Sequence, residues 1–182
     1  SITGRYAAAE ELLLDVMRRS AQLFGKLRPP YTGALNNLAG LYESMGRNAE
    51  AERGYLEILR ADSITTGHDS LRTLMYINNL GMLYSRMDRL REAERMFRQA
   101  MALHALQHTE RTRSYATVLN NLAMVYMNEK RYRDAEPLFK QSRDINLEAV
   151  GDKHPLYGDD INNLGSWNWR MGNTTEAERC FR

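Results

Sequence analysis

Four pairs of adjacent asparagines, spaced evenly along the chain, are the residues with the clearest capacity for binding chemistry. An asparagine amide both donates and accepts hydrogen bonds, so it can bond to the backbone of an extended peptide whatever the peptide's sequence. A row of such amides predicts a surface that binds a peptide or a protein segment. The pairs are Asn36 and Asn37, Asn78 and Asn79, Asn120 and Asn121, and Asn162 and Asn163, each pair 42 residues after the last.

The stretch around each asparagine pair recurs with the same period, which is typical of a repeat array. Small residues follow the asparagines, a second series of alanines lies 12 residues further on, and aromatic residues recur near both. Small side chains opposite large ones, in register, favour antiparallel helix pairs that stack on one another. The small residues are Ala39, Gly81, Ala123 and Gly165, then Ala51, Ala93, Ala135 and Ala177.

Each repeat is expected to contain a first helix with the asparagines (helix A), a short turn, and a second helix with the alanine (helix B). The turns are predicted at residues 45–47, 87–89, 129–131 and 171–173. Residues 5–24 are expected to form a helix B whose buried face carries Tyr6, Ala9, Leu12, Leu13, Val16 and Met17, because these follow a three-four spacing. The predicted organisation is one array over 1–182, a fragment of a larger protein, divided into a truncated repeat (1–30), complete repeats (31–72, 73–114, 115–156) and a truncated repeat (157–182).

This order of small and aromatic residues resembles the tetratricopeptide repeat, whose usual period is about 34 residues. The longer period, with Leu-Asn-Asn-Leu-Ala at residues 119–123 and Ala-Glu-Pro-Leu-Phe at residues 135–139, is similar to the kinesin-light-chain subtype. The resemblance implies an all-α fold, a right-handed superhelix of antiparallel helix pairs in which helix A lines the concave side. It also implies that helix A asparagines contact a peptide: Asn37, Asn79, Asn121 and Asn163, with Asn36, Asn78, Asn120 and Asn162 beside them.

The two asparagines of a pair lie about 100° apart on a helical wheel, so they cannot share one role. The second of each pair is predicted to line the groove. The first either lines it too or bonds to a neighbouring helix and holds the stacking angle, and the residues leave this open. Specificity is expected from outward positions that differ between repeats. Met82, Met124 and Met127 form an apolar contact surface or fill gaps between helices, while Arg86 and Arg170 pair with acidic peptide residues or remain solvated.

Other kinds of chemistry find little support in the sequence. The net charge of +2 is too small to favour nucleic acid, and one cysteine, Cys180, allows no internal disulfide. His104 and His108 have a spacing that can bind metal, but no third ligand accompanies them, so surface histidines are expected. No phosphate-binding loop and no membrane-spanning run are found. We therefore expect no catalytic residues, no metal and no cofactor, no nucleic-acid or membrane partner, and a cytoplasmic location.

These observations predict a non-catalytic scaffold that binds a peptide or protein segment in the concave groove. The alternative is a regulatory or sensor array that packs against an enzymatic domain of the same protein, such as an ATPase or a protease. Self-association is a third hypothesis, because uncapped repeats at the two ends of an array expose apolar surface.

Overall fold

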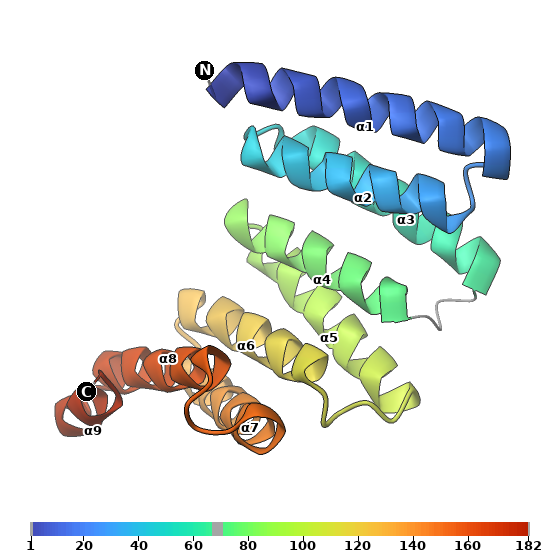
Figure 1. Ribbon diagram of the computed structural model, residues 1–182. Helices are drawn as coiled ribbons and strands as arrows, with labels where there is room; N and C mark the ends of the chain where they lie inside the picture. The colour runs from blue at the N-terminus through green and yellow to red at the C-terminus, as the bar shows by residue number, and fades with distance from the viewer. Residues whose placement is uncertain (1, 67–70, 182) are drawn as a thin grey trace. The chain divides into compact units, whose positions relative to one another are not determined.

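The computed structural model describes residues 2–66 and 71–181, and over these ranges it is all-α, as predicted, with no strand (Figure 1). Residues 67–70, in the predicted linker of the first complete repeat, lie outside the described residues. The described residues form the helices α1 (Ile2–Phe24), α2 (Pro29–Ser44), α3 (Asn48–Thr66), α4 (Leu71–Arg86), α5 (Leu90–Leu106), α6 (Arg113–Asn128), α7 (Tyr132–Val150), α8 (Pro155–Met171) and α9 (Thr174–Phe181).

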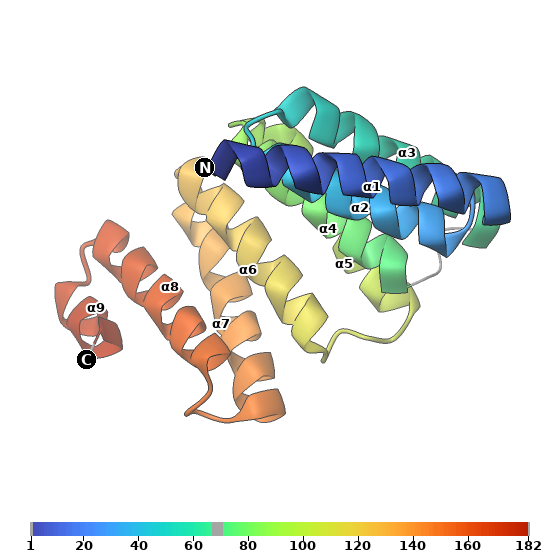
Figure 2. The same ribbon diagram turned by 45° about the horizontal axis from the view of Figure 1, so that its top comes forward.

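The chain forms two compact units, one up to Met87 and one from Asp88 onward. In the first unit α1 packs against α2, α2 against α3, and α3 against α4; in the second, each helix from α5 to α9 packs against the next. Successive helices within a unit run in opposite directions, as the two views show (Figures 1 and 2). The fold is therefore built from antiparallel neighbours. The division into the five sequence repeats stays a prediction.

The turns between helix A and helix B lie where the sequence predicted them, at residues 45–47, 87–89, 129–131 and 172–173. Each contains one residue with positive φ at the same repeat position: Gly46 (72°), Asp88 (59°), Lys130 (61°) and Gly172 (80°). Glycine adopts this left-handed conformation without steric cost, whereas residues with a Cβ are strained there. One left-handed residue is thus enough to reverse the chain between the paired helices.

Small side chains allow the paired helices to approach closely. Ala39 on α2 and Ala51 on α3 are fully buried, and a Cβ added at Gly54 on α3 would lie 3.1 Å from the Cβ of Ala39. The aromatic residue on the next turn, Tyr55, is buried beside them. In the last pair a Cβ at Gly165 would lie 2.6 Å from Cε1 of Phe181, so an alanine there would require Phe181 or Cys180 to shift.

The predicted buried face of α1 is wrong at Leu12 and Val16. Leu12 is 64% exposed and Val16 is 39% exposed, while Tyr6, Ala9, Leu13 and Met17 are only partly buried. The residues 42 positions after Leu12 and Val16 are Gly54 and Ile58 of α3, which are buried, Gly54 directly against α2. Among the described residues α1 packs chiefly against α2, and Leu12 and Val16 lie on its solvent-exposed side.

A turn arginine joins neighbouring helices in both units. The guanidinium of Arg47 lies 4.2 Å from the ring centroid of Tyr42 and pairs with Glu10 of α1 at 2.9 Å. Arg131 repeats this arrangement, 4.1 Å from the ring of Tyr126 and 3.0 Å from Glu94 of α5. Stacking on an aromatic ring while binding a carboxylate suits the planar, permanently charged guanidinium.

One polar residue per helix B is buried at the same repeat position. Ser20, Asp62, His104 and Asn146 all lie at this position and all are buried. Their partners differ: Asp62 accepts a hydrogen bond from Thr73, and Asn146 donates to Asp160 at 2.7 Å. Since a buried polar group must be hydrogen-bonded to avoid a desolvation penalty, each helix B matches one particular next helix A.

The strain of the left-handed turn can be measured by comparing two glycine-to-alanine substitutions, one in a turn and one in a helix. Gly46→Ala places a Cβ at φ 72° with no atom within 4 Å, so only backbone strain changes. We expect it to lower the free energy of unfolding by about 1 kcal/mol. Gly33→Ala in α2, also with open space around its Cβ, should raise it by about 0.5–1 kcal/mol. Urea denaturation followed by circular dichroism measures both, and equal effects of the two substitutions would contradict the proposed strain.

Candidate functional site

The asparagine pairs occupy the same place on four successive A-type helices, α2, α4, α6 and α8. Asn37 and Asn162 are exposed, and the other members are partly buried: Asn36, Asn78, Asn79, Asn120, Asn121 and Asn163. Partial burial beside buried leucines allows each amide to contact a neighbouring helix as well as solvent. The pairs are therefore placed for both of the roles that the sequence left open.

The structure shows hydrogen bonds between asparagines of neighbouring A helices. Asn79 of α4 donates through Nδ2 to Oδ1 of Asn36 on α2 at 3.1 Å. In the second unit Asn163 of α8 donates in the same way to Asn120 of α6 at 3.4 Å. The second asparagine of one repeat thus bonds to the first asparagine of the preceding repeat. These bonds support a structural role for the first asparagine of each pair. The second asparagine of the following pair takes part in the same bonds.

Asn120 uses both ends of its amide inside the second unit. Its Oδ1 accepts from Asn163, and its Nδ2 donates to the carboxylate of Asp160. Asp160 is fully buried and also accepts from Ser142 at 2.8 Å and from Asn146 at 2.7 Å. A peptide that binds Asn120 would have to compete with these bonds. The binding role predicted for this residue stays a prediction.

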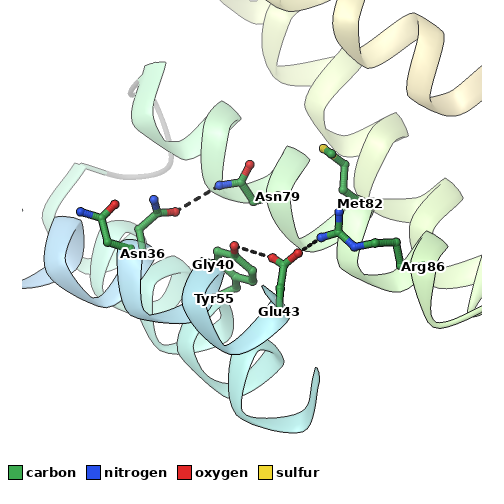
Figure 3. Close-up of a pocket in the computed structure, with 8 residues that line it drawn as sticks. Asn36, Gly40, Glu43, Tyr55, Asn79, Met82 and Arg86 are labelled. Atoms are coloured by element: carbon green, nitrogen blue, oxygen red, sulfur yellow. Dashed lines mark hydrogen bonds and ion pairs between the residues drawn. The ribbon is translucent and has the colours of Figure 1, made fainter. Parts of the chain in front are cut away.

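A cavity of about 370 Å³ lies between α2 and α4, within the first unit (Figure 3). It brings together five of the residues that the sequence proposed for peptide binding: Asn36, Asn37, Asn79, Met82 and Arg86. Gly40, Glu43 and Tyr55 complete its lining. The side-chain amide of Asn78, which is not part of the lining, donates to the sulfur of Met82 at 3.5 Å. Amide, thioether and charged groups therefore face one hollow on the helix A surface.

Glu43 bonds to two other residues that line this cavity, Arg86 and Tyr55. It is not among the binding residues predicted from the sequence. Its carboxylate forms an ion pair with Arg86 and accepts a hydrogen bond of 2.6 Å from the hydroxyl of Tyr55 (Figure 3). The Glu43 side chain is 13% exposed and that of Arg86 is 53% exposed. Burial raises the pKa of Tyr55 to about 12, so its hydroxyl remains a donor. Arg86 thus has a partner within the chain, Glu43, which neither of its two predicted roles included.

The same positions in the second unit, two repeats further along, carry different side chains. Met127 replaces Glu43, Phe139 replaces Tyr55, and Met124 replaces Gly40, while Arg170 replaces Arg86. Met124 and Arg170 are exposed, and Met127 is partly buried. The carboxylate that pairs with Arg86, and the hydroxyl that donates to this carboxylate, therefore have no counterpart at these positions beside Arg170. The pocket predicted for Met82, Met124 and Met127 together stays a prediction.

A second cavity, of about 590 Å³, lies at α8 and α9 and is lined by Ser166, Trp169, Arg170 and Phe181. Trp169 is 61% exposed. Ser166, Trp169 and Phe181 stand at the repeat positions of Gly40, Glu43 and Tyr55, so this cavity corresponds to one side of the cavity in the first unit. Trp169 occupies one of the outward helix A positions that differ between repeats, which could have identified it from the sequence. It is not among the predicted binding residues.

The prediction that His104 is a surface histidine is wrong, whereas His108 is exposed. His104 is fully buried; its Nδ1 lies 2.7 Å from Oγ1 of Thr109, and its Nε2 lies 3.5 Å from Oγ of Ser114. Its ring meets that of Tyr115 edge-on at 5.2 Å. Burial lowers the pKa of His104, although Thr109 and the charge of Glu110 act in the opposite direction.

Neither histidine belongs to a metal site in the described part of the chain, where no group of three or more potential ligands comes together. Cys180 is partly buried, and burial raises the pKa of its thiol, so the reactive thiolate is disfavoured. Over residues 2–66 and 71–181 no helix combines the length and apolarity needed to cross a bilayer. The predictions of no enzymatic activity, no cofactor and a cytoplasmic location stay predictions.

The family model described as Tetratricopeptide repeat matches residues 31–105 and 114–182. The chain belongs to the tetratricopeptide-repeat family. Arrays of this family generally mediate protein–protein interactions, which agrees with the coarse form of the prediction from the sequence. No curated protein matches the chain.

Solved structures with this tetratricopeptide fold include kinesin-light-chain-like proteins. BtubC (BKLC) from P. vanneervenii superposes with a TM-score of 0.85 at 20% identity, covering 99% of this chain and 70% of that one. The nearly identical TPR-like repeats of a Podosopora anserina kinesin-light-chain candidate give 0.82 at 21% identity, over 98% and 84% of the two chains. MamA gives 0.66 at 17%, over 99% and 86%. These likenesses confirm the expected kinesin-light-chain-like fold.

Burial of His104 makes the stability of this tetratricopeptide array depend on pH. Because its pKa in the fold lies below the unfolded value of about 6.5, the unfolded chain binds the proton more readily. The stabilising difference is complete above pH 6.5 and is lost as the pH falls below it. We expect the midpoint of urea unfolding to fall more steeply between pH 7 and pH 5 in the wild type than in His104→Asn, which carries the residue of the next repeat. His108→Asn should behave like the wild type, and an identical pH profile for all three proteins would refute this explanation.

Proposed function

We propose that this chain binds a peptide, or a segment of a protein partner, on the helix A surface that carries the asparagines. The observation that carries the proposal is the cavity between α2 and α4, where five independently selected residues meet. Binding sites are usually concave and present a few polar groups among apolar ones. Here Asn36, Asn37 and Asn79 supply the amides, and Met82 supplies an adaptable apolar surface.

The exposed asparagine is best placed to bind a peptide backbone. Asn37 lines the cavity and is exposed, while Asn36 and Asn79 bond to each other. A peptide amide that reaches this pair could replace one interhelical bond with an equivalent one, because an asparagine side chain has both donors and acceptors. Asn78 would extend this surface within the first unit. Asn120, Asn121, Asn162 and Asn163 would form a corresponding surface on the second unit.

Charge distribution along helix A supports a preference for acidic peptide residues near Arg170. Arg86 is paired with Glu43, so its positive charge is largely compensated within the cavity. Arg170 has no ion-pair partner among the residues that the structure describes, and methionine stands where Glu43 would be. An unpaired arginine on a surface is available for carboxylates.

Selection from a random peptide library tests the proposal. Peptides enriched on the wild type are measured against the double variant Asn37→Ala and Met82→Ala, for which we expect a dissociation constant at least about tenfold higher, equivalent to about 1.4 kcal/mol. The matched control is Arg60→Ala, on the exposed face of α3. Circular dichroism establishes that all three proteins fold alike. If binding is unchanged in the double variant, or falls equally in the control, the helix A surface of the first unit is not the binding site.

A further inference from the structure

The last repeat lacks the tyrosine and the turn arginine that recur in the earlier ones. Asn168 stands 42 residues after Tyr126, and Asn173 stands 42 residues after Arg131. The two asparagines bond to each other, with Nδ2 of Asn173 donating to Oδ1 of Asn168 at 3.2 Å. A ring and a guanidinium have thus been replaced together by two short amides.

In the preceding repeat the guanidinium sits among carboxylates. Arg131 lies over the ring of Tyr126 and bonds to Glu94 at 3.0 Å and to Asp134 at 2.8 Å. Arg98 of α5 donates to the hydroxyl of Tyr126 at 3.0 Å. Glu129, in the same turn, also pairs with Arg131 at 2.9 Å. The repeat thus places three carboxylates and one aromatic face around this guanidinium.

The corresponding place in the last repeat is a cavity of about 330 Å³ that keeps most of these groups. Glu136 and Glu176 line it at the positions of Glu94 and Asp134, and Lys140 stands at the position of Arg98. Glu136 pairs with Lys140 at 2.6 Å, and Glu176 pairs with Arg179 at 2.5 Å. Arg143 of α7, which pairs with Asp144 at 2.6 Å, also lines the cavity. Trp167 completes this side; it is only 7% exposed, and its indole Nε1 donates to the carbonyl of Tyr132 at 2.7 Å.

We propose that this cavity binds the guanidinium group of an arginine side chain from a protein partner. Two of the three carboxylates around Arg131 have counterparts here, Glu136 and Glu176, while Met171 stands at the position of Glu129 and Asn173 at that of the turn arginine. The Lys140 and Arg179 pairs are between neighbours on one helix and are at least half exposed on the cation, so exchanging a partner costs little. The planar fork of an arginine can bond to two carboxylates at once, whereas a lysine ammonium is a point charge.

This site differs from the helix A cavity and does not depend on peptide binding there. Its lining comes from α7, α8 and α9 and includes none of the residues proposed for the helix A surface. An arginine of the partner would therefore add a second contact. It would occupy the place that Arg131 of the chain itself occupies in the preceding repeat. Failure of this proposal would leave the helix A proposal unaffected.

Titration with N-acetyl-arginine methylamide, followed by the indole N–H resonances in nitrogen–proton NMR spectra, tests the inference. A Trp169→Phe variant assigns the two indole signals. We expect the Trp167 signal to shift in a saturable way, the Trp169 signal to stay in place, and the lysine analogue to bind at least about fivefold more weakly. No saturable shift of Trp167, or an equal one with the lysine analogue, would overturn the proposal.

Two substitutions separate specific binding from a structural effect. Asn173→Arg restores the array's own guanidinium, so it should fill the cavity, abolish the Trp167 shift and raise the melting temperature. Asn173→Gln keeps an amide and should retain binding. A shift that survives Asn173→Arg in the folded protein would show that the arginine analogue binds elsewhere.

Discussion

The close approach of paired helices at small side chains is the constraint on which the rest of this structure depends. Ala39, Ala51 and Gly54 leave so little space that the added Cβ at Gly54 would already lie 3.1 Å from its neighbour. The aromatic residue one turn after the helix B alanine is buried in α3, α5 and α7, as Tyr55, Phe97 and Phe139, whereas Phe181 of the short α9 is 54% exposed. The asparagines stand at the same repeat position of each helix A. Binding groups at the period of the array follow from this packing.

Variation at buried positions gives each junction between repeats its own chemistry. The position shared by Ser20, Asp62, His104 and Asn146 is always buried and always polar, yet its hydrogen-bond partner changes from junction to junction. Such a group is stabilising only beside its matching partner, since an unsatisfied buried polar atom costs about 1–3 kcal/mol. The repeats are therefore alike in backbone and different in what they accept as a neighbour, which fixes their order.

The surface shows the same combination of constant backbone and changing side chains. At one helix A position Glu43 neutralises Arg86, while two repeats later Met127 leaves Arg170 without a carboxylate. At the turn, Tyr126 and Arg131 fill a space that Asn168 and Asn173 leave open. A compensated charge or a filled space contributes to the stability of the array, whereas an uncompensated charge or an open space leaves groups that a partner can contact.

The all-α class, the period, the turn positions and the helix that carries the asparagines could all be predicted from the amino-acid sequence. These follow from local propensities and from residues that recur at fixed spacing, such as Gly46 and Ala39. Only the tertiary structure decided that Leu12 is exposed, that His104 is buried, that Asn79 bonds to Asn36, and that Arg86 pairs with Glu43. Each of these depends on which helix lies opposite and at what distance. Periodicity assigns a residue to a face, but the partner on that face comes from a segment distant in the sequence.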